Sequence, residues 1–358
     1  MKIIHILKEG LSKDNMVSEE LVQKDFLRYT RTVGMTTMRG RGFYYPVDST
    51  MSSDGRIYVV SRSSENAPSD TRRVTVLNED GEYFGVFGTG VSGEDGAFKW
   101  PCGIAADSQN RIYVTDEHLH TVFIYKDSGE YLGRWGARGT AEGQLNGPSG
   151  IAFDQDGNVL ISDSLNHRIQ KFSNDGEFIL SFGSQGSGDG ELNLPWGLGT
   201  NSESEVFVAD WGNDSIQRFT TDGEFVARYG SSGRQDGEFT RPASVVVSQD
   251  GYIYVADWGN ERVQVLTPEG EFVQKLRGEA TDSNWAKDFL GVNVEEASAR
   301  ERANLEPEIQ YFNDDPHEES SHIEKLFWGP TSLMIDEKDR LFVTEANRHR
   351  IQVYERNK

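Results

Sequence analysis

One carboxylate and two arginines are the strongest candidates for chemistry in this sequence. Asp48 stands two residues after Pro46, whereas the equivalent positions after the other repeated prolines hold only Gly or Ser. A lone carboxylate in that place can act as a general base or as a ligand of a divalent cation. Arg62 or Arg241 could hold an anionic group of a substrate beside it. A buried salt bridge with a structural role accounts for Asp48 at least as well.

Aromatic residues indicate a binding surface near these groups. Five of the seven tryptophans fall in segments expected to be loops, beside the repeated prolines or just after a repeated acidic residue. Tryptophan in a loop favours either packing or ligand contact, so these residues predict an aromatic-walled pocket for a small apolar or ring-bearing ligand. Trp211 and Trp258, which share one repeat position, could instead pack between repeat units. The candidate ligand-binding residues are Tyr45, Trp100, Trp196, Trp211, Trp258, Trp328 and His118.

Two recurring positions resemble metal ligands, but structural roles are expected for both. An acidic residue follows each repeated apolar run, and such a carboxylate commonly accepts hydrogen bonds from loop amides. A histidine recurs four residues later on separate units, so we do not expect three side chains to converge as a zinc site requires. Cys102 is the only cysteine, which excludes an internal disulfide. The acids are Asp116, Asp163, Asp210, Asp257 and Glu345, and the histidines are His120, His167 and His349.

Composition narrows the classes of partner. The 358 residues carry 36 Lys and Arg against 58 Asp and Glu, a formal charge of −22, which argues against nucleic-acid binding because that needs a basic surface. No apolar run is long enough to span a membrane, and the N-terminal apolar segment is too short for a signal peptide, so a cytoplasmic location is expected. The sequence contains no phosphate loop, dinucleotide fingerprint or Gly-Xaa-Ser-Xaa-Gly motif. We therefore expect no nucleotide or flavin, whereas a divalent cation and the oligomeric state are left open.

A repeat must position all of these groups. In one unit, residues 150–154, 158–162, 168–172 and 178–183 read as strands, with Asp-Gly turns inside the first and last pairs. Four antiparallel strands per unit is the pattern of a propeller blade, so six units predict an all-β, six-bladed β-propeller. The units start near Pro46, Pro101, Pro148, Pro195, Pro242 and Pro330, at spacings of 55, 47, 47, 47 and 88 residues.

The segment after the second strand carries a family resemblance. Residues 163–170, Asp-Ser-Leu-Asn-His-Arg-Ile-Gln, and their counterparts 210–217, 257–264 and 345–352 resemble the signature of NHL repeats. The resemblance covers nearly all of residues 26–358 and implies the propeller fold. It implies little about activity, because such propellers include lyases, hydrolases and modules that bind protein or RNA.

The two ends of the chain are predicted to close the ring within a single domain, residues 1–358. The last unit lacks a fourth strand, and residues 26–34 match the fourth-strand pattern after an N-terminal extension, residues 1–25. Pairing of this strand with the last unit would remove an exposed sheet edge.

The repeat is interrupted most strongly between the fifth and sixth units. Relative to the 47-residue period, 88 − 47 = 41 extra residues lie within 278–328. Trp285, Phe289 and Leu290 have helical spacing after a Thr-Asp-Ser cluster, so one or two helices are expected, followed by an acidic coil at 313–319. The insertion is interpreted as a lid over the channel mouth. A helical buttress between blades that touches no ligand is the alternative.

Two functions remain open at this point. An enzyme of the lyase or hydrolase kind would use Asp48 as base or metal ligand, and Arg62 or Arg241 to hold a small anionic molecule in the channel mouth. A non-catalytic scaffold would use the same face to bind a protein or peptide. The lone carboxylate and the expected lid favour an enzyme, and the absence of a complete catalytic constellation favours a scaffold.

Overall fold

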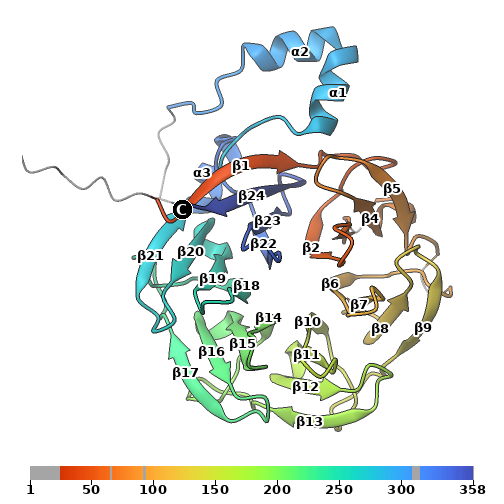
Figure 1. The fold of residues 1–358 in the computed structure, drawn as a ribbon, viewed down its shortest axis with the longest axis vertical. Coiled ribbons are helices and arrows are strands. Elements are labelled where there is room, and N and C mark those ends of the chain that lie inside the picture. Colours follow the sequence, from red (N-terminus) through yellow and green to blue (C-terminus); the bar gives the residue numbers. More distant parts are fainter. Residues whose placement is uncertain (1–24, 65–66, 92–93, 309–314, 358) are drawn as a thin grey trace, which may run out of the picture.

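The molecule is a ring of six antiparallel sheets. The computed structural model describes residues 25–64, 67–91, 94–308 and 315–357. Each of the six sheets has four strands and forms one blade around a central axis, as Figure 1 shows. This confirms the predicted six-bladed β-propeller. The expected N-terminal extension lies outside the described residues, apart from Asp25. No helix in these ranges is long and apolar enough to cross a membrane.

Each blade places its first strand next to the axis and its fourth strand at the perimeter (Figure 1). Blade 1 contains β2 (Pro46–Met51), β3 (Ile57–Ser61), β4 (Arg73–Leu77) and β5 (Tyr83–Phe87). Blade 2 contains β6 (Pro101–Ala106), β7 (Ile112–Asp116), β8 (Thr121–Tyr125) and β9 (Tyr131–Trp135). Blade 3 contains β10 (Pro148–Phe153), β11 (Val159–Asp163), β12 (Arg168–Phe172) and β13 (Phe178–Phe182). Blade 4 contains β14 (Pro195–Thr200), β15 (Val206–Asp210), β16 (Ser215–Phe219) and β17 (Phe225–Tyr229). Blade 5 contains β18 (Pro242–Val247), β19 (Ile253–Asp257), β20 (Arg262–Leu266) and β21 (Phe272–Leu276). Blade 6 contains β22 (Pro330–Ile335), β23 (Leu341–Glu345), β24 (Arg350–Arg356) and β1 (Leu27–Val33). Short 3-10 helices lie between the second and third strands of four blades, at η1 (Ser69–Thr71), η2 (Ser164–Asn166), η3 (Trp211–Asn213) and η4 (Trp258–Asn260).

Burial and turn chemistry explain why these segments are strands. Every residue of β11 is buried, because neighbouring sheets cover both of its faces. Gly157 and Gly176 occupy the two Asp-Gly turns of blade 3 with φ of 80° and 89°, a region that favours glycine. Apolar clusters fill the space between adjacent blades, and one of them joins Tyr113 of blade 2 to Ile161 of blade 3. The core is therefore a series of interfaces between blades.

Small residues near the axis allow the inner strands to approach one another. A Cβ atom on Gly150 would come within 2.5 Å of the carbonyl oxygen of Trp196 in the next blade. The close approach of the two backbones therefore requires glycine at this position. The same column holds Asp48 in blade 1, whose carboxylate accepts hydrogen bonds from both neighbouring blades.

The N-terminal strand closes the ring as predicted. Strand β1 pairs with β24 in an antiparallel register that runs from Leu27 opposite Arg356 to Val33 opposite Ile351. Blade 6 is thus built from both ends of the described chain. Its fourth strand comes from the N-terminal side and its first three come from the C-terminal side.

The insertion between blades 5 and 6 contains three helices. These are α1 (Asn284–Val292), α2 (Val294–Glu301) and α3 (Pro316–His322). Ser283 caps α1 by accepting a hydrogen bond from the N–H of Ala286 at 3.1 Å, as the Thr-Asp-Ser cluster predicted. Helix α3 lies where an acidic coil was expected, so that expectation was wrong. Asp315 begins the helix by accepting from the N–H of His317, and Pro316 suits its first turn.

The insertion braces the perimeter of the ring. Figure 1 shows α1 and α2 outside the ring, beyond β1. Trp285 of α1 is 1% exposed and donates its indole N–H to the carbonyl oxygen of Gly81 in blade 1. Arg41 of blade 1 forms an ion pair with Asp288 of the same helix at 2.6 Å. The insertion thus ties blade 5 and blade 6 to blade 1, and none of its residues in 278–308 or 315–328 lines the channel cavity.

Candidate ligand-binding site at the channel mouth

The recurring acidic residues hold loops in place. Asp163 accepts a hydrogen bond from the backbone N–H of Asn146 at 2.6 Å. Its other oxygen accepts from the side chains of Asn166, Arg168 and Gln170 at 2.8 to 2.9 Å. The equivalent backbone N–H is bound by Asp116, Asp210, Asp257 and Glu345 in their own blades. This confirms that these carboxylates bind loop amides.

The recurring histidines join neighbouring blades, each through one hydrogen bond that we call a latch. Nδ1 of His349 in blade 6 accepts a hydrogen bond from the backbone N–H of Tyr45 in blade 1, at 2.8 Å. His120 and His167 make the same contact to the blade that follows each of them, at 3.1 Å. The three side chains therefore stay apart, as expected. Within the described ranges, no group of three or more His, Cys, Asp or Glu residues is placed to hold a metal ion.

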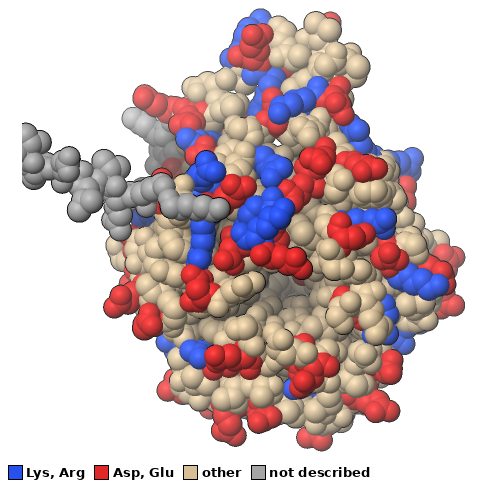
Figure 2. Space-filling model, in the orientation of Figure 1, with Lys and Arg blue, Asp and Glu red and all other residues tan. Residues whose placement is uncertain are grey.

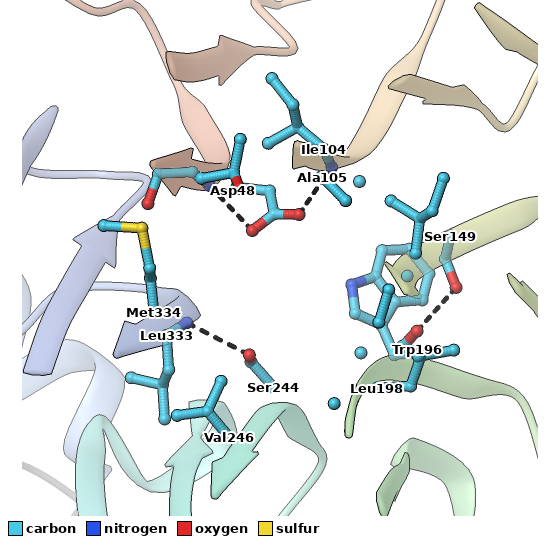
Figure 3. A pocket seen from close by; sticks show the side chains of 18 of the residues that line it. Asp48, Ile104, Ala105, Ser149, Trp196, Leu198, Ser244, Val246, Leu333 and Met334 are labelled. Atoms are coloured by element: carbon cyan, nitrogen blue, oxygen red, sulfur yellow. Dashed lines mark hydrogen bonds between the residues drawn. The ribbon is translucent and has the colours of Figure 1, made fainter. Parts of the chain in front are cut away.

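A cavity of 360 Å³ lies along the central channel. Its walls come from the first strands of all six blades, and its volume falls in the range of small-ligand sites. Asp48 and Trp196 are the two candidate residues that line it, and Figure 3 shows them on opposite sides of the opening with Ser149 and Ser244. No Arg, Lys or His is among the described lining residues. The lining therefore mixes apolar side chains with hydroxyl groups and contains one carboxylate.

Three protein donors hold that carboxylate. Oδ2 of Asp48 accepts from the backbone N–H of Ile104 in β6, and Oδ1 accepts from the N–H of Ser49, both at 2.8 Å. Oδ1 also accepts from the hydroxyl of Ser332 in β22. Burial raises the pKa of Asp48 to about 6, and these three hydrogen bonds offset part of the effect. The side chain connects blade 1 to blades 2 and 6 around the channel.

The two candidate arginines lie on the mouth face and do not pair with Asp48. Arg62 forms an ion pair with Glu117, and its guanidinium carbon lies 4.7 Å from the ring centroid of Trp100. Its expected role beside Asp48 is therefore not found, because Glu117 of the next blade takes the charge. Arg241 is exposed and stacks over Trp211 at 4.8 Å. In the described part of the chain, no carboxylate forms an ion pair with the Arg241 guanidinium.

Two tryptophans and Arg241 lie together near the seam between blades 4 and 5. Pro195 of β14 is opposite Asp210 of β15, so Trp196 near the start of β14 and Trp211 just after β15 lie at the same end of the sheet. Trp196 lines the cavity, and Trp211 supports Arg241 on the outer side. We call Trp196, Trp211 and Arg241 the blade 4–5 patch. It offers the indole of Trp196 in the cavity wall and a cation that lies over the ring of Trp211.

Two other candidate residues and the single cysteine have separate surroundings. The ring of Tyr45 lies 4.8 Å from that of His349, at the latch between blades 6 and 1. His118 is exposed, and its backbone N–H donates to Asp116. Cys102 lines the cavity, and burial raises the pKa of its thiol to about 12. Such a thiol is a poor nucleophile.

Sequence reasoning missed an acid–imidazole pair at the seam between blades 5 and 6. Glu261 is fully buried, and its Oε1 lies 2.5 Å from Nδ1 of His317 in α3. The candidates Trp258 and Trp328 flank this imidazole, with ring centroids 6.4 Å and 5.9 Å away. Glu261 could have been noticed because it replaces the His or Asp of its column. No pattern locates His317, since the insertion does not repeat.

Six four-stranded blades around a channel define a six-bladed β-propeller. The NHL repeat matches residues 145–172 and 239–266, and with the six blades this makes the chain an NHL-repeat propeller. No protein of curated function matches it significantly in sequence.

Solved structures share this fold at low sequence identity. A Bacteroides thetaiotaomicron protein of unknown function is 19% identical, with a TM-score of 0.57, over 92% of this chain and 76% of that one. Virginiamycin B lyase from Staphylococcus aureus is 13% identical, with a TM-score of 0.53, over 92% and 99%. A streptogramin B lyase is 13% identical, with a TM-score of 0.52, over 92% and 98%. At these identities the likeness concerns the fold.

Proposed function

We propose that this propeller binds a small ligand that combines an anionic group with a ring-bearing or apolar part. The anion would be held by Arg241, and the ring would lie against Trp196 and Trp211 and extend into the cavity. The observation that carries this proposal is the exposed guanidinium of Arg241, stacked on Trp211 without a carboxylate partner among the described residues. Arg62, the other candidate, is already paired with Glu117.

The charge of the molecule makes an unpaired arginine informative. The chain carries a net charge of −22, and Figure 2 shows acidic side chains spread around the visible face, with a hollow at the centre of the ring. Such a surface repels anions at long range, so an anionic ligand needs a local cation. A guanidinium that lies on an aromatic ring is held in position and can still bind a carboxylate in its own plane.

The geometry supports binding more than catalysis. Asp48 is the carboxylate among the residues that line the cavity, and three protein donors already bind it. A lyase or hydrolase reaction requires an acid or base that reaches the reacting atoms, and no second titratable group lines the cavity except the weakly acidic thiol of Cys102. A peptide with a terminal carboxylate and an aromatic side chain has the same two groups. The patch therefore fits a peptide-binding scaffold as well.

Phenylacetate is a suitable probe, because it joins a ring to a carboxylate. It should change the tryptophan fluorescence in a saturable way, and neutral phenylacetamide should bind about tenfold more weakly, because it lacks the charge-assisted hydrogen bond. Trp196→Ala should weaken binding of both probes. Arg28→Gln, at a side chain 61% exposed on β1, should change neither. Equal binding of the two probes, or no saturable signal, would refute the proposal.

A further inference from the structure

The channel cavity contains one charged acceptor, and the protein uses it only in part. Asp48 lines the cavity and is not fully buried. Its Oδ1 accepts two hydrogen bonds, from the N–H of Ser49 and the hydroxyl of Ser332, whereas its Oδ2 accepts only one, from the N–H of Ile104. An ionised carboxylate has about four acceptor positions, two on each oxygen. One position on Oδ2 is therefore open.

The Asp48 carboxylate is directed into the channel. Figure 3 shows it on one side of the opening, next to Ile104, with Trp196 on the far side. Among the described lining residues there is no Arg, Lys or His, so no cationic side chain in the wall can donate to the open position. A group inside the channel has to supply this hydrogen bond.

The two serine hydroxyl groups labelled in Figure 3 are neutral and already engaged. Oγ of Ser149 donates to the carbonyl oxygen of Trp196 at 2.9 Å, and Oγ of Ser244 accepts the N–H of Leu333 at 3.1 Å. A hydrogen bond to an ionised acceptor is about twice as strong as one between neutral groups. Asp48 is therefore the strongest acceptor that the cavity lining offers to a ligand.

The rest of the cavity suits an aromatic ring. Its volume is 360 Å³, and a cavity of about 150 Å³ is already large enough to hold benzene. Figure 3 shows Leu198, Val246 and Leu333 around the opening together with the indole of Trp196. A neutral hydroxyl group leaves water at a much lower cost than an ammonium group does, which matters in a lining that is partly apolar. The wall and the acceptor together fit a ring that carries a hydroxyl group.

We infer that Asp48 is a specificity-determining residue of the channel, whose Oδ2 accepts a hydrogen bond from a neutral hydroxyl group on the ring of the ligand. The ligand class is a phenol or a comparable ring alcohol. This inference rests on the proposed function for the position of the ring, and it deepens that function because it names the group at the buried end of the ligand. Asp48 acts in binding here, as an acceptor.

Phenol and anisole test this acceptor, because a methyl group in anisole replaces the hydrogen that phenol can donate. Isothermal titration into the full-length chain at about pH 8 should show saturable binding of phenol, about tenfold tighter than that of anisole. In Asp48→Asn most of this preference should be lost, because no charged acceptor remains. Thr200→Val is the matched control and should keep the preference, since Thr200 also lines the cavity but its hydroxyl donates to the carbonyl oxygen of Phe153 at 2.9 Å.

The pH dependence tests the same acceptor in the wild-type chain, without any effect of a substitution on folding. Burial raises the pKa of Asp48 to about 6, so the carboxyl is ionised at about pH 8 and mostly protonated at about pH 5. The preference for phenol should therefore decrease between these two pH values. The partners of Asp48 on β2, β6 and β22 are two backbone N–H groups and a hydroxyl, which do not titrate, and the Cys102 thiol in the same lining, with a pKa of about 12, stays neutral. Phenol resembles the tyrosine side chain, whose pKa is about 10, and stays protonated throughout.

The outcomes separate this inference from the proposed function. Phenol and anisole have no anionic group, so Arg241→Gln should change the binding of neither, whereas phenylacetate reports on Arg241. The role of Asp48 is refuted if phenol does not bind saturably, if the wild type binds phenol and anisole equally, or if Asp48→Asn and low pH leave the preference unchanged. Saturable phenylacetate binding alongside such a result would leave the proposed function standing.

Discussion

The latch between blades 6 and 1 makes the stability of the ring depend on pH. Nδ1 of His349 accepts the N–H of Tyr45, and it can do so only while the imidazole nitrogen is unprotonated. Burial lowers the pKa of His349 from 6.5 to about 4. The folded state therefore resists protonation that the unfolded chain accepts. The stabilisation is fully present above pH 6.5 and is lost as the pH falls from there toward 4.

The two pKa values set the size of the effect. With 6.5 in the unfolded chain and about 4 in the folded state, lowering the pH from about 7 to about 5 should cost about 2 kcal/mol of unfolding free energy. The substitution His349→Asn isolates this contribution. Asparagine tolerates the left-handed φ of 54°, and its Oδ1 can accept the same N–H, as Asp214 does from Arg241 at 2.7 Å in blade 4.

Urea unfolding of both proteins at the two pH values measures the effect. The difference between wild type and His349→Asn should change by about 2 kcal/mol, with the variant gaining at the lower pH. Other titrating groups, Asp48 and Glu261 among them, are present in both proteins and cancel in this comparison. A difference that stays constant between the two pH values would show that His349 does not form the latch in its neutral state.

Three further substitutions test other parts of the structure. Asp48→Asn removes a carboxyl whose pKa is raised from 3.8 to about 6, so the wild type should lose about 2 kcal/mol relative to this variant as the pH rises from 4 to 7; parallel pH profiles in urea unfolding would contradict this. Trp285→Ala should lower the unfolding free energy by about 3 kcal/mol, since the indole is buried at the contact with blade 1, and a loss below about 1 kcal/mol would mean that the insertion does not brace the ring. Gly150→Ala should destabilise by about 2 kcal/mol in thermal melts through overlap with the next inner strand, whereas Gly291→Ala in α1, where a Cβ meets nothing within 4 Å, should be neutral or stabilising; equal effects would contradict the crowding at the axis.

The fold followed from the sequence because each level of the repeat agrees with the others. The proline spacing, the Asp-Gly turns and the buried second strands all specify the same four-stranded unit. The closing strand was predictable from residues 26–34 because the sixth unit visibly lacked its fourth strand. The roles of Asp163 and its equivalents were predictable for the same reason, since a repeated side chain meets a repeated surrounding.

The site was harder to predict, because it depends on which side chains meet across blades. Nothing in the sequence shows that Glu117 neutralises Arg62, or that Trp211 carries Arg241. The contacts of Asp48 with Ile104 and Ser332 join residues 56 and 284 positions apart. His317 comes from a segment without periodicity, and its pairing with Glu261 follows only from the position of α3 against η4 of blade 5.

The central claim is that Arg241 holds an anion at the mouth of the channel, and isothermal titration of phenylacetate into wild type and Arg241→Gln tests it most directly. Glutamine keeps the length and polarity of much of the side chain but cannot form the charged, bidentate contact. The account predicts that Arg241→Gln weakens phenylacetate binding about tenfold or more and leaves phenylacetamide binding unchanged. Equal phenylacetate affinity in the two proteins would contradict it.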